Sequence, residues 1–266
     1  MPILQVDKLH FSYDKTEVLK GVDFIINRSM MIGIIGANGS GKTTLLKNIS
    51  GYLKPTSGNI FITRKNIKDF AVKEKAKYIA YVPQDIDYDF EFSCYDLVMM
   101  GRIPFLKRFQ SERKEDKSIV MDCMKITNTW QFKDKNIKDL SGGERQRVYI
   151  ARALAQKPKI LLMDEPVSHL DIKYQIETLS LVNNLSSNGI LVITVLHDIN
   201  LASQFCDEVF IMKEGRIMAA GSPKNVLTVN NIRAAFSIDV ELLENPINHI
   251  PYIIPILSRK KQFKVV

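Results

Sequence analysis

Residues 30–44 combine a short apolar run, a glycine-rich turn and the start of a helical pattern. The three pieces read MMIGII, then GANGSG, then KTT. Glycines let the backbone curl so that successive N–H groups point inward, and a following helix N-terminus adds positive potential. This G-x-x-x-x-G-K-T pattern between a strand and a helix predicts a phosphate-binding loop within an α/β domain.

Two side chains of this stretch are suited to a nucleoside triphosphate. Lys42 supplies a positive charge for the β- and γ-phosphates, and the Thr43 hydroxyl is a suitable ligand for Mg²⁺. The alternative is a glycine-rich turn that binds no ligand. The Lys-Thr pair and the flanking elements together favour nucleotide binding.

Length and composition bound the remaining possibilities. A chain of 266 residues accommodates one sizeable α/β domain with an insertion, or two small domains. No apolar run approaches the roughly 18–20 residues needed to cross a bilayer, and the N-terminus is predicted to be a first strand rather than a signal peptide. Three scattered cysteines favour a reducing cytoplasm over a disulfide framework.

The formal charge of +8 is compatible with nucleic acid, an anionic membrane surface, or solubility alone. The basic residues are dispersed along the chain, and residues 259–261 form a pure basic cluster near the C-terminus. This distribution favours a solvated surface and predicts no nucleic-acid partner.

The apolar patterns predict two kinds of sheet. Alternation over residues 3–6, 9–13 and 18–24 predicts an N-terminal antiparallel layer, and short strands follow at 60–62 and 79–83. Continuous apolar runs at 160–163 and 190–196 are typical of central parallel strands covered on both faces. Residues 172–186 are the expected crossover helix between them.

A helical period replaces the strand pattern between residues 88 and 129. A short helix is predicted at 96–101, and a second helix carries an i, i+3, i+4 apolar stripe over 119–126. The C-terminal part begins with a hairpin pattern over 209–219. After Ser222-Pro223 we expect short helices and then a second hairpin, whose strand Pro251 and Pro255 keep at an edge.

A second helix start carries its own signal. Ser141 followed by Glu144 forms a capping box, which predicts a helix from Ser141 to about Ala155. Gly142 and Gly143 in its first turn lower helix propensity by roughly 1 kcal/mol each. They are explained if a phosphate approaches this terminus closely, while the alternative is simply a well-capped helix.

Polar residues follow the predicted central strands. Asp164 ends the run 160–163 beside the phosphate loop, where it can hold Mg²⁺, and Glu165 can orient or deprotonate an attacking water. His197 ends the run 190–196 and is either a structural residue or a sensor of the γ-phosphate. Tyr13 is either a core residue or a platform for an adenine ring.

The order of these motifs, with Gln84 and the segments LSGGERQ (140–146) and SHLD (168–171), resembles the nucleotide-binding domain of ATP-binding cassette (ABC) proteins. The resemblance covers residues 1–222. It implies an α/β fold of the P-loop NTPase class, with a RecA-like parallel sheet, an N-terminal antiparallel β layer and a helical subdomain at about 88–156. Residues 223–266 would be a small extension packed on the core.

The resemblance also implies roles for individual residues. Glu165 would be the general base, with His197 as a switch and Gln84 as a contact to Mg²⁺ and water. The Mg²⁺ ligands would be Thr43, Gln84 and Asp164. The ATP-binding residues would be Tyr13, Gly36, Ala37, Asn38, Gly39, Ser40, Gly41, Lys42, Thr43, Thr44, Ser141, Gly142, Gly143, Glu144 and Asp171.

A dimer follows from the same resemblance. Ser141–Gly143 would bind the γ-phosphate of ATP held by a second copy, in a head-to-tail dimer with two-fold symmetry, and Asp171 would link the two sites. The sequence departs from the family at Val167, where Thr or Ser is usual, and at residues 28–30, which lack the usual Gly-Glu turn.

Residues 96–104 (DLVMMGRIP) are similar to a stretch found in ATPases that import iron–siderophores, haem and vitamin B12, as are segments 168–172 and 196–202. This similarity implies a peripheral ATPase on the cytoplasmic face of the membrane, with permease subunits and an extracytoplasmic solute-binding protein as partners. The alternatives are an importer of another metal or oxyanion and a soluble cassette ATPase of translation or repair. A non-hydrolysing cassette is disfavoured because Lys42, Asp164, Glu165 and His197 are all present.

Overall fold

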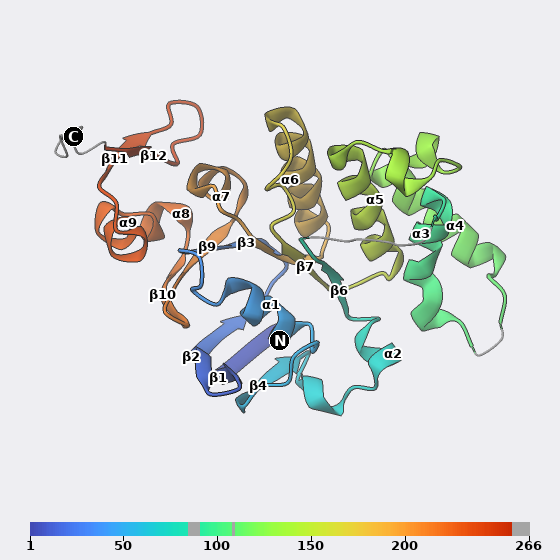
Figure 1. The fold of residues 1–266 in the computed structure, drawn as a ribbon, viewed down its shortest axis with the longest axis horizontal. Coiled ribbons are helices and arrows are strands. Elements are labelled where there is room, and N and C mark those ends of the chain that lie inside the picture. Colours follow the sequence, from blue (N-terminus) through green and yellow to red (C-terminus); the bar gives the residue numbers. More distant parts are fainter. Residues whose placement is uncertain (85–90, 108–109, 257–266) are drawn as a thin grey trace, which may run out of the picture.

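The computed structural model describes residues 1–84, 91–107 and 110–256. Its centre is a six-stranded sheet (Figure 1). The spatial order of strands is β10 (Arg216–Gly221), β9 (Glu208–Lys213), β3 (Met31–Ile35), β8 (Leu191–Val195), β7 (Ile160–Asp164) and β6 (Ile79–Val82). All neighbours are parallel except the β9–β10 hairpin. Every residue of β3, β7 and β8 is buried, which explains their continuous apolar sequences.

A second, antiparallel sheet covers one face of this centre. Its strand order is β2 (Thr16–Ile26), β1 (Leu4–Tyr13), β4 (Ser57–Ile62) and β5 (Lys65–Asn66). Helix α1 (Lys42–Ile49) lies between the two sheets, and α6 (Ile172–Ser187) and α7 (Ile199–Phe205) cover the opposite face (Figure 1). The antiparallel layer is therefore confirmed.

One expectation for this layer is wrong, because residues 3–6 and 9–13 belong to a single strand. Lys8 has a positive φ of 42°, and its N–H donates to Asp23 Oδ2 at 3.1 Å. The ladder with β2 shifts register between Val6 and Leu9. A bulge therefore lies at Asp7-Lys8 within one continuous strand.

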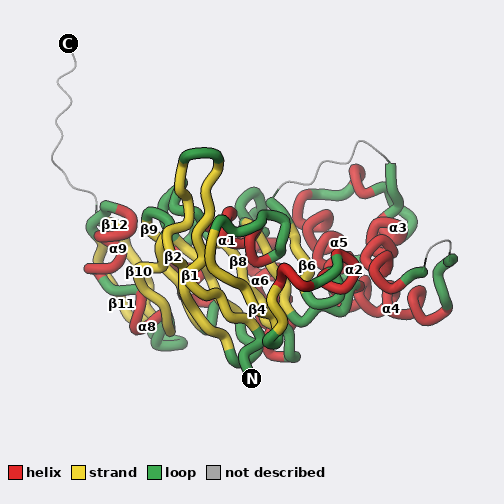
Figure 2. The backbone as a smooth tube through the Cα atoms, turned by 90° about the horizontal axis from the view of Figure 1, so that it is seen from below, coloured by secondary structure: helices red, strands yellow, loops and turns green. Residues whose placement is uncertain are grey.

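Helices form the end of the molecule beyond β6 (Figure 2). They are α3 (Cys94–Met99), the 3₁₀ segment η2 (Met100–Phe105), α4 (Lys114–Ile126), the short turns η3 (Trp130–Phe132) and η4 (Ile137–Asp139), and α5 (Gly142–Ala155). The predicted helix over 141–155 and the apolar stripe of α4 are confirmed. The expected start of this helical part, at 88, lies outside the described residues.

The C-terminal segment lies at the opposite end (Figures 1 and 2). It contains α8 (Pro223–Val226), α9 (Val229–Phe236) and the antiparallel hairpin β11 (Val240–Glu244) and β12 (Pro251–Pro255). Short helices followed by a hairpin are therefore confirmed. Two small elements, η1 (Ile67–Asp69) and α2 (Val72–Lys75), complete the connection between β5 and β6.

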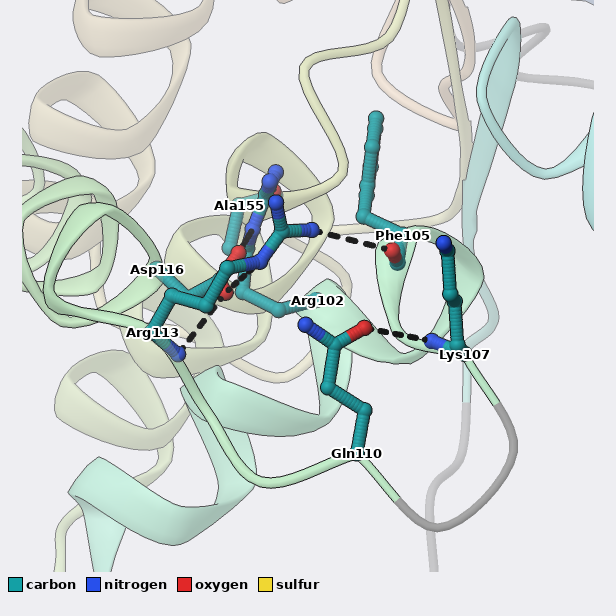
Figure 3. Close-up of polar contacts among 7 residues, drawn as sticks. All are labelled: Arg102, Phe105, Lys107, Gln110, Arg113, Asp116 and Ala155. Atoms are coloured by element: carbon teal, nitrogen blue, oxygen red, sulfur yellow. Dashed lines mark hydrogen bonds and ion pairs between the residues drawn. The ribbon is translucent and has the colours of Figure 1, made fainter.

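Gly101 and Arg102 at the start of η2 are buried in the helical end, and Figure 3 shows the polar contacts of Arg102. A Cβ on Gly101 would lie 2.3 Å from the carbonyl oxygen of Arg152, so a side chain does not fit there. Arg102 is only 4% exposed; its Nε donates to Asp116 Oδ1 at 3.0 Å and its Nη1 to the Ala155 carbonyl at 2.7 Å. Burial raises the pKa of Asp116, but the N–H of Arg113 and the Arg102 guanidinium outweigh burial and hold that pKa below its usual range. Arg102 therefore joins η2, α4 and the C-terminus of α5.

We expect Arg102→Ala to lower the free energy of unfolding by about 3–5 kcal/mol, because it removes the buried charge partner of the Asp116 carboxylate and leaves only the half-exposed Arg113 guanidinium, at 3.6 Å. Urea unfolding measures this loss. Arg233→Ala is the matched control, since its ion pair with Asp239 is more than half exposed, and it should cost no more than about 1 kcal/mol. Equal losses for the two variants would contradict the role given to Arg102.

Candidate nucleotide-binding site

The predicted phosphate loop connects β3 to α1 and curls as expected. Gly41 has φ 101°, a left-handed conformation that strains other residues, and it is the N-cap of α1. The Lys42 side chain folds back over the loop, where its Nζ donates to the carbonyl oxygens of Gly36 (2.8 Å) and Ala37 (3.1 Å). Burial lowers the pKa of Lys42, and the carboxylates of Glu165 and Asp164 oppose that shift. The loop thus presents a buried cation next to two acids.

A pocket of about 380 Å³ opens over this loop. Its lining comprises Tyr13, Val18, Asn38, Gly39, Gly41, Lys42, Thr43, Thr44 and Glu165. Tyr13 is 46% exposed at the rim, and its ring meets the ring of Phe11 edge-on with centroids 4.8 Å apart. The core alternative for Tyr13 is therefore wrong, and its ring is available to a ligand in the pocket.

Asp164, at the end of β7, lies directly behind the loop. It is 2% exposed, and it accepts hydrogen bonds from Thr43 Oγ1 and the Tyr81 hydroxyl, both at 3.0 Å. Burial raises the pKa of Asp164, and these two hydrogen bonds oppose the shift. Thr43 and Asp164 offer the hydroxyl and carboxylate oxygens that Mg²⁺ prefers, and Mg²⁺ is commonly held by one or two protein oxygens plus phosphates. The pair fits that ion.

Tyr81 is a site residue that the sequence analysis did not find. It lies on β6, whose neighbour in the sheet is β7, and burial together with the Asp164 charge raises the pKa of its hydroxyl. Its O–H therefore stays protonated and donates to the carboxylate. The available signal was a tyrosine in an otherwise apolar strand, because a buried tyrosine hydroxyl usually finds a partner.

Three predicted residues meet at the carboxyl ends of β6, β7 and β8. Gln84 Nε2 donates to Glu165 Oε2 at 2.7 Å, and His197 Nε2 contacts Glu165 Oε1. Glu165 itself has φ 49°, an uncommon conformation for a residue other than glycine that costs on the order of 1 kcal/mol or more. The structure thus brings Gln84, Glu165 and His197 together beside the pocket, with the carboxylate held between an amide and an imidazole.

The second helix start does not join this pocket within one chain. The capping box is present: the Glu144 N–H donates to Ser141 Oγ at 3.4 Å, and the Ser141 N–H donates to Glu144 Oε2 at 2.9 Å. Ser141 and Gly142 are exposed, and neither lines the loop pocket. Gly142 instead lines a second pocket, of about 350 Å³, together with Gln84 and Glu165. The N-terminus of α5 therefore borders Glu165 without lining the loop pocket.

One interpretation of this terminus needs correction. A Cβ on Gly143 would lie 2.4 Å from the ring of Tyr174 on α6, so the chain's own side chain explains this glycine without a phosphate. At Gly142 the nearest neighbour would be the Leu170 side chain, at an ordinary 3.6 Å. Asp171 is exposed and caps α6 by accepting the Tyr174 N–H at 3.1 Å.

Within the part of the chain that the structure describes, no helix is both long enough and apolar enough to span a membrane.

Comparisons with known proteins agree with this geometry. The model of the ABC transporter family matches residues 19–168. The chain is 39% identical to an uncharacterized ABC transporter ATP-binding protein of Methanocaldococcus jannaschii, over 96% of this chain and 98% of that protein. It is 37% identical to a cobalamin import ATP-binding protein of Halobacterium salinarum over 96% of this chain, but spans only 64% of that relative's length. A ferric enterobactin transport ATP-binding protein of Escherichia coli is 33% identical over 95% of this chain and 94% of its own length.

Solved structures give the same result. A structure described as an inward-facing metal-chelate type ABC transporter has a TM-score of 0.85 and 27% identity, covering 96% of this chain and 98% of that one. The dimeric structure of a bacterial ABC transporter cassette has a TM-score of 0.72 and 29% identity, covering 82% of this chain and 98% of that one. The chain therefore belongs to the ABC transporter family, as an ATP-binding cassette of that family.

Proposed function

We propose that this chain is an ATPase subunit that drives import of a metal chelate or a cobalamin through separate membrane subunits. The observation that carries the hydrolytic part is the meeting of Glu165, Gln84 and His197 beside the loop pocket. The phosphates of ATP lie along Gly36–Thr44 with Lys42 at the β- and γ-phosphates, and adenine stacks on the exposed Tyr13 ring. Thr43 and Asp164, with Gln84, would hold Mg²⁺, which would neutralise charge on the phosphates.

Glu165 acts as the general base in this proposal. It follows the buried strand β7 and lines the pocket, so its carboxylate can accept a proton from water beside the γ-phosphate. Gln84 and His197 contact its two oxygens, and each must yield part of that contact when a water is bound. Gln84 and His197 therefore orient the Glu165 carboxylate. Whether that carboxylate can bind water depends on the position of the segments that contain Gln84 and His197.

The active unit in this proposal is a head-to-tail dimer. Ser141–Gly143 lie outside the loop pocket of their own chain, and a helix N-terminus of this kind favours a phosphate. Each ATP then lies between the loop of one copy and Ser141–Gly143 of the other, with Asp171 linking the two sites. Since the γ-phosphate completes both contacts, hydrolysis opens the dimer.

The proposed partners and cargo are inferred from the named relatives. One relative is named for cobalamin import and another for ferric enterobactin transport, and the metal-chelate type structure is similar over nearly the whole chain. A helical subdomain at about 88–156 and Gln84 form the groove for a cytoplasmic helix of the permease, and a solute-binding protein delivers the cargo from outside. Residues 1–222 are the cassette and 223–266 its extension, at the cytoplasmic face of the membrane.

Reconstitution tests this proposal. The chain is combined in liposomes with candidate permease subunits, and ATP hydrolysis is measured with candidate binding proteins loaded with a ferric chelate or with cobalamin. We expect stimulation by one of these cargoes and uptake that stops without ATP. Hydrolysis that no permease changes would favour a soluble cassette ATPase instead.

Lys42→Ala should weaken ATP binding at least about 30-fold, because it removes a buried cation from charge-assisted bonds to phosphate. Titration with a fluorescent ATP analogue measures this. Lys54→Ala makes the same change of charge at an exposed position and should bind as the wild type does. An unchanged ATP affinity in Lys42→Ala would contradict the assignment of this loop to the nucleotide site.

A further inference from the structure

Helix α7 begins immediately after His197. Asp198 is its N-cap, and the Asp198 carboxylate accepts the N–H groups of Asn200 at 2.7 Å and Leu201 at 3.1 Å. His197 therefore lies between the buried strand β8, which ends at Val195, and this capped helix start, so α7 fixes the backbone on its C-terminal side. Its imidazole contacts Glu165. A shift of α7 would therefore move the His197 imidazole relative to Glu165.

The C-terminal hairpin is bonded to α7 at two points on one face. Asn200 Oδ1 accepts the N–H of Ile253 at 2.8 Å, and Asn200 Nδ2 donates to the carbonyl of Ile253 at 3.1 Å. Both backbone groups of one residue in β12 are thus paired by a single side chain. Three positions further on, Ser203 Oγ donates to the carbonyl of Pro251 at 2.6 Å.

The opposite side of α7 is buried in the core. Ala202 is fully buried and Cys206 is 6% exposed, in one cluster with Met31 of β3 and Val192 of β8. On the hairpin side, Ser203 and Ile253 are each 3% exposed. This short helix is therefore held between the central sheet and the hairpin. A segment that merely covered the core would need apolar contacts alone, whereas the Asn200 amide also fixes the register of β12 against α7.

We propose that the hairpin β11–β12 positions His197 against Glu165, and that Asn200 is the positioning residue that joins the hairpin to α7. The inference rests on the proposed function, in which Glu165 is the base that His197 orients. It makes the C-terminal extension part of the hydrolytic apparatus, although the hairpin touches neither Glu165 nor the loop pocket.

Asn200→Ala removes both hydrogen bonds to Ile253. We expect kcat for ATP to fall at least about tenfold, as for a misplaced catalytic group, while the Kd for a fluorescent ATP analogue stays within about twofold. The matched control is Asn231→Ala, which removes a side-chain bond to the Val226 carbonyl (2.8 Å) within the extension, between α9 and α8 rather than between the hairpin and α7. It should leave kcat unchanged. Ser203→Ala breaks the other bond and serves as a milder second variant if Asn200→Ala does not fold.

A double-mutant comparison distinguishes positioning of His197 from a general loss of structure. In a His197→Ala background, Asn200→Ala should lower kcat no further. A full additional loss in that background would overturn the proposal, and so would a His197→Ala variant with normal kcat, although ATP hydrolysis itself would then stand.

Histidine NMR gives a readout that needs no turnover. The chain has four histidines, and the His197 ring signal is the one missing from His197→Ala. This signal should shift or broaden in Asn200→Ala and stay unchanged in Asn231→Ala. An unchanged signal in Asn200→Ala overturns the positioning role. If the wild-type chain hydrolyses no ATP, the proposed function fails while this measurement still decides the inference.

Discussion

Glu165→Gln is expected to lower ATP turnover about 10²–10⁴-fold, the usual scale for losing a general base. The amide keeps the shape of the side chain and an oxygen that can accept the Gln84 N–H, so the arrangement at the end of β7 is preserved. ATP affinity should stay close to that of the wild type, because Lys42, Thr43 and the loop backbone are untouched. Steady-state hydrolysis and a binding titration together measure the two effects.

The matched control is Glu74→Gln. This carboxylate pairs with Lys65 at a partly exposed position on α2, outside the residues that line the pocket, and its loss should leave turnover unchanged. Near-normal hydrolysis in Glu165→Gln would remove Glu165 from the role of base. A parallel fall in affinity would instead show that the carboxylate supports nucleotide binding.

Ser141→Arg should abolish ATP-driven association of two copies, and turnover with it. Ser141 is exposed at the N-terminus of α5, where the proposed dimer places a second copy's γ-phosphate, so a bulky side chain fills that space. Binding of ATP to the isolated chain should remain, because Ser141 does not line the loop pocket. Sizing measures association, and the analogue titration measures binding.

The control for this variant separates the lost cap from the added bulk. Ser141→Ala also removes the hydroxyl that accepts the Glu144 N–H, which costs about 1 kcal/mol of stability, but leaves the terminus open. Two copies of the Ser141→Ala variant should still associate when ATP is present. If Ser141→Arg dimerises as well as Ser141→Ala does, the second copy does not use this terminus.

The elements with strong local signals were predictable from the sequence. The loop over 36–44 was predictable because a phosphate-binding backbone needs glycines followed by Lys-Thr. The helix from Ser141 was predictable because its N-cap and Glu144 lie three residues apart. The buried parallel strands were predictable because burial on both faces demands continuous apolar residues.

Contacts between residues far apart in the chain were not predictable. Tyr81 on β6 donates to Asp164 on the neighbouring strand β7, 83 residues further along the chain, and no local pattern marks its hydroxyl as a partner. The ring that excludes a side chain from Gly143 belongs to Tyr174 on another helix. Asn200 meets Ile253 across 53 residues, and nothing near either residue indicates the pair. Sequence patterns report local conformation and burial, while these contacts depend on how the elements pack.

The central claim is that one chain carries half of the nucleotide site. The most direct measurement is the mass in solution of the Glu165→Gln variant, by light scattering, with saturating ATP, with ADP and without nucleotide. We expect the mass of one chain, 30.4 kDa, without nucleotide and with ADP, and twice that mass with ATP. A variant that binds ATP fully and keeps the mass of one chain would contradict it.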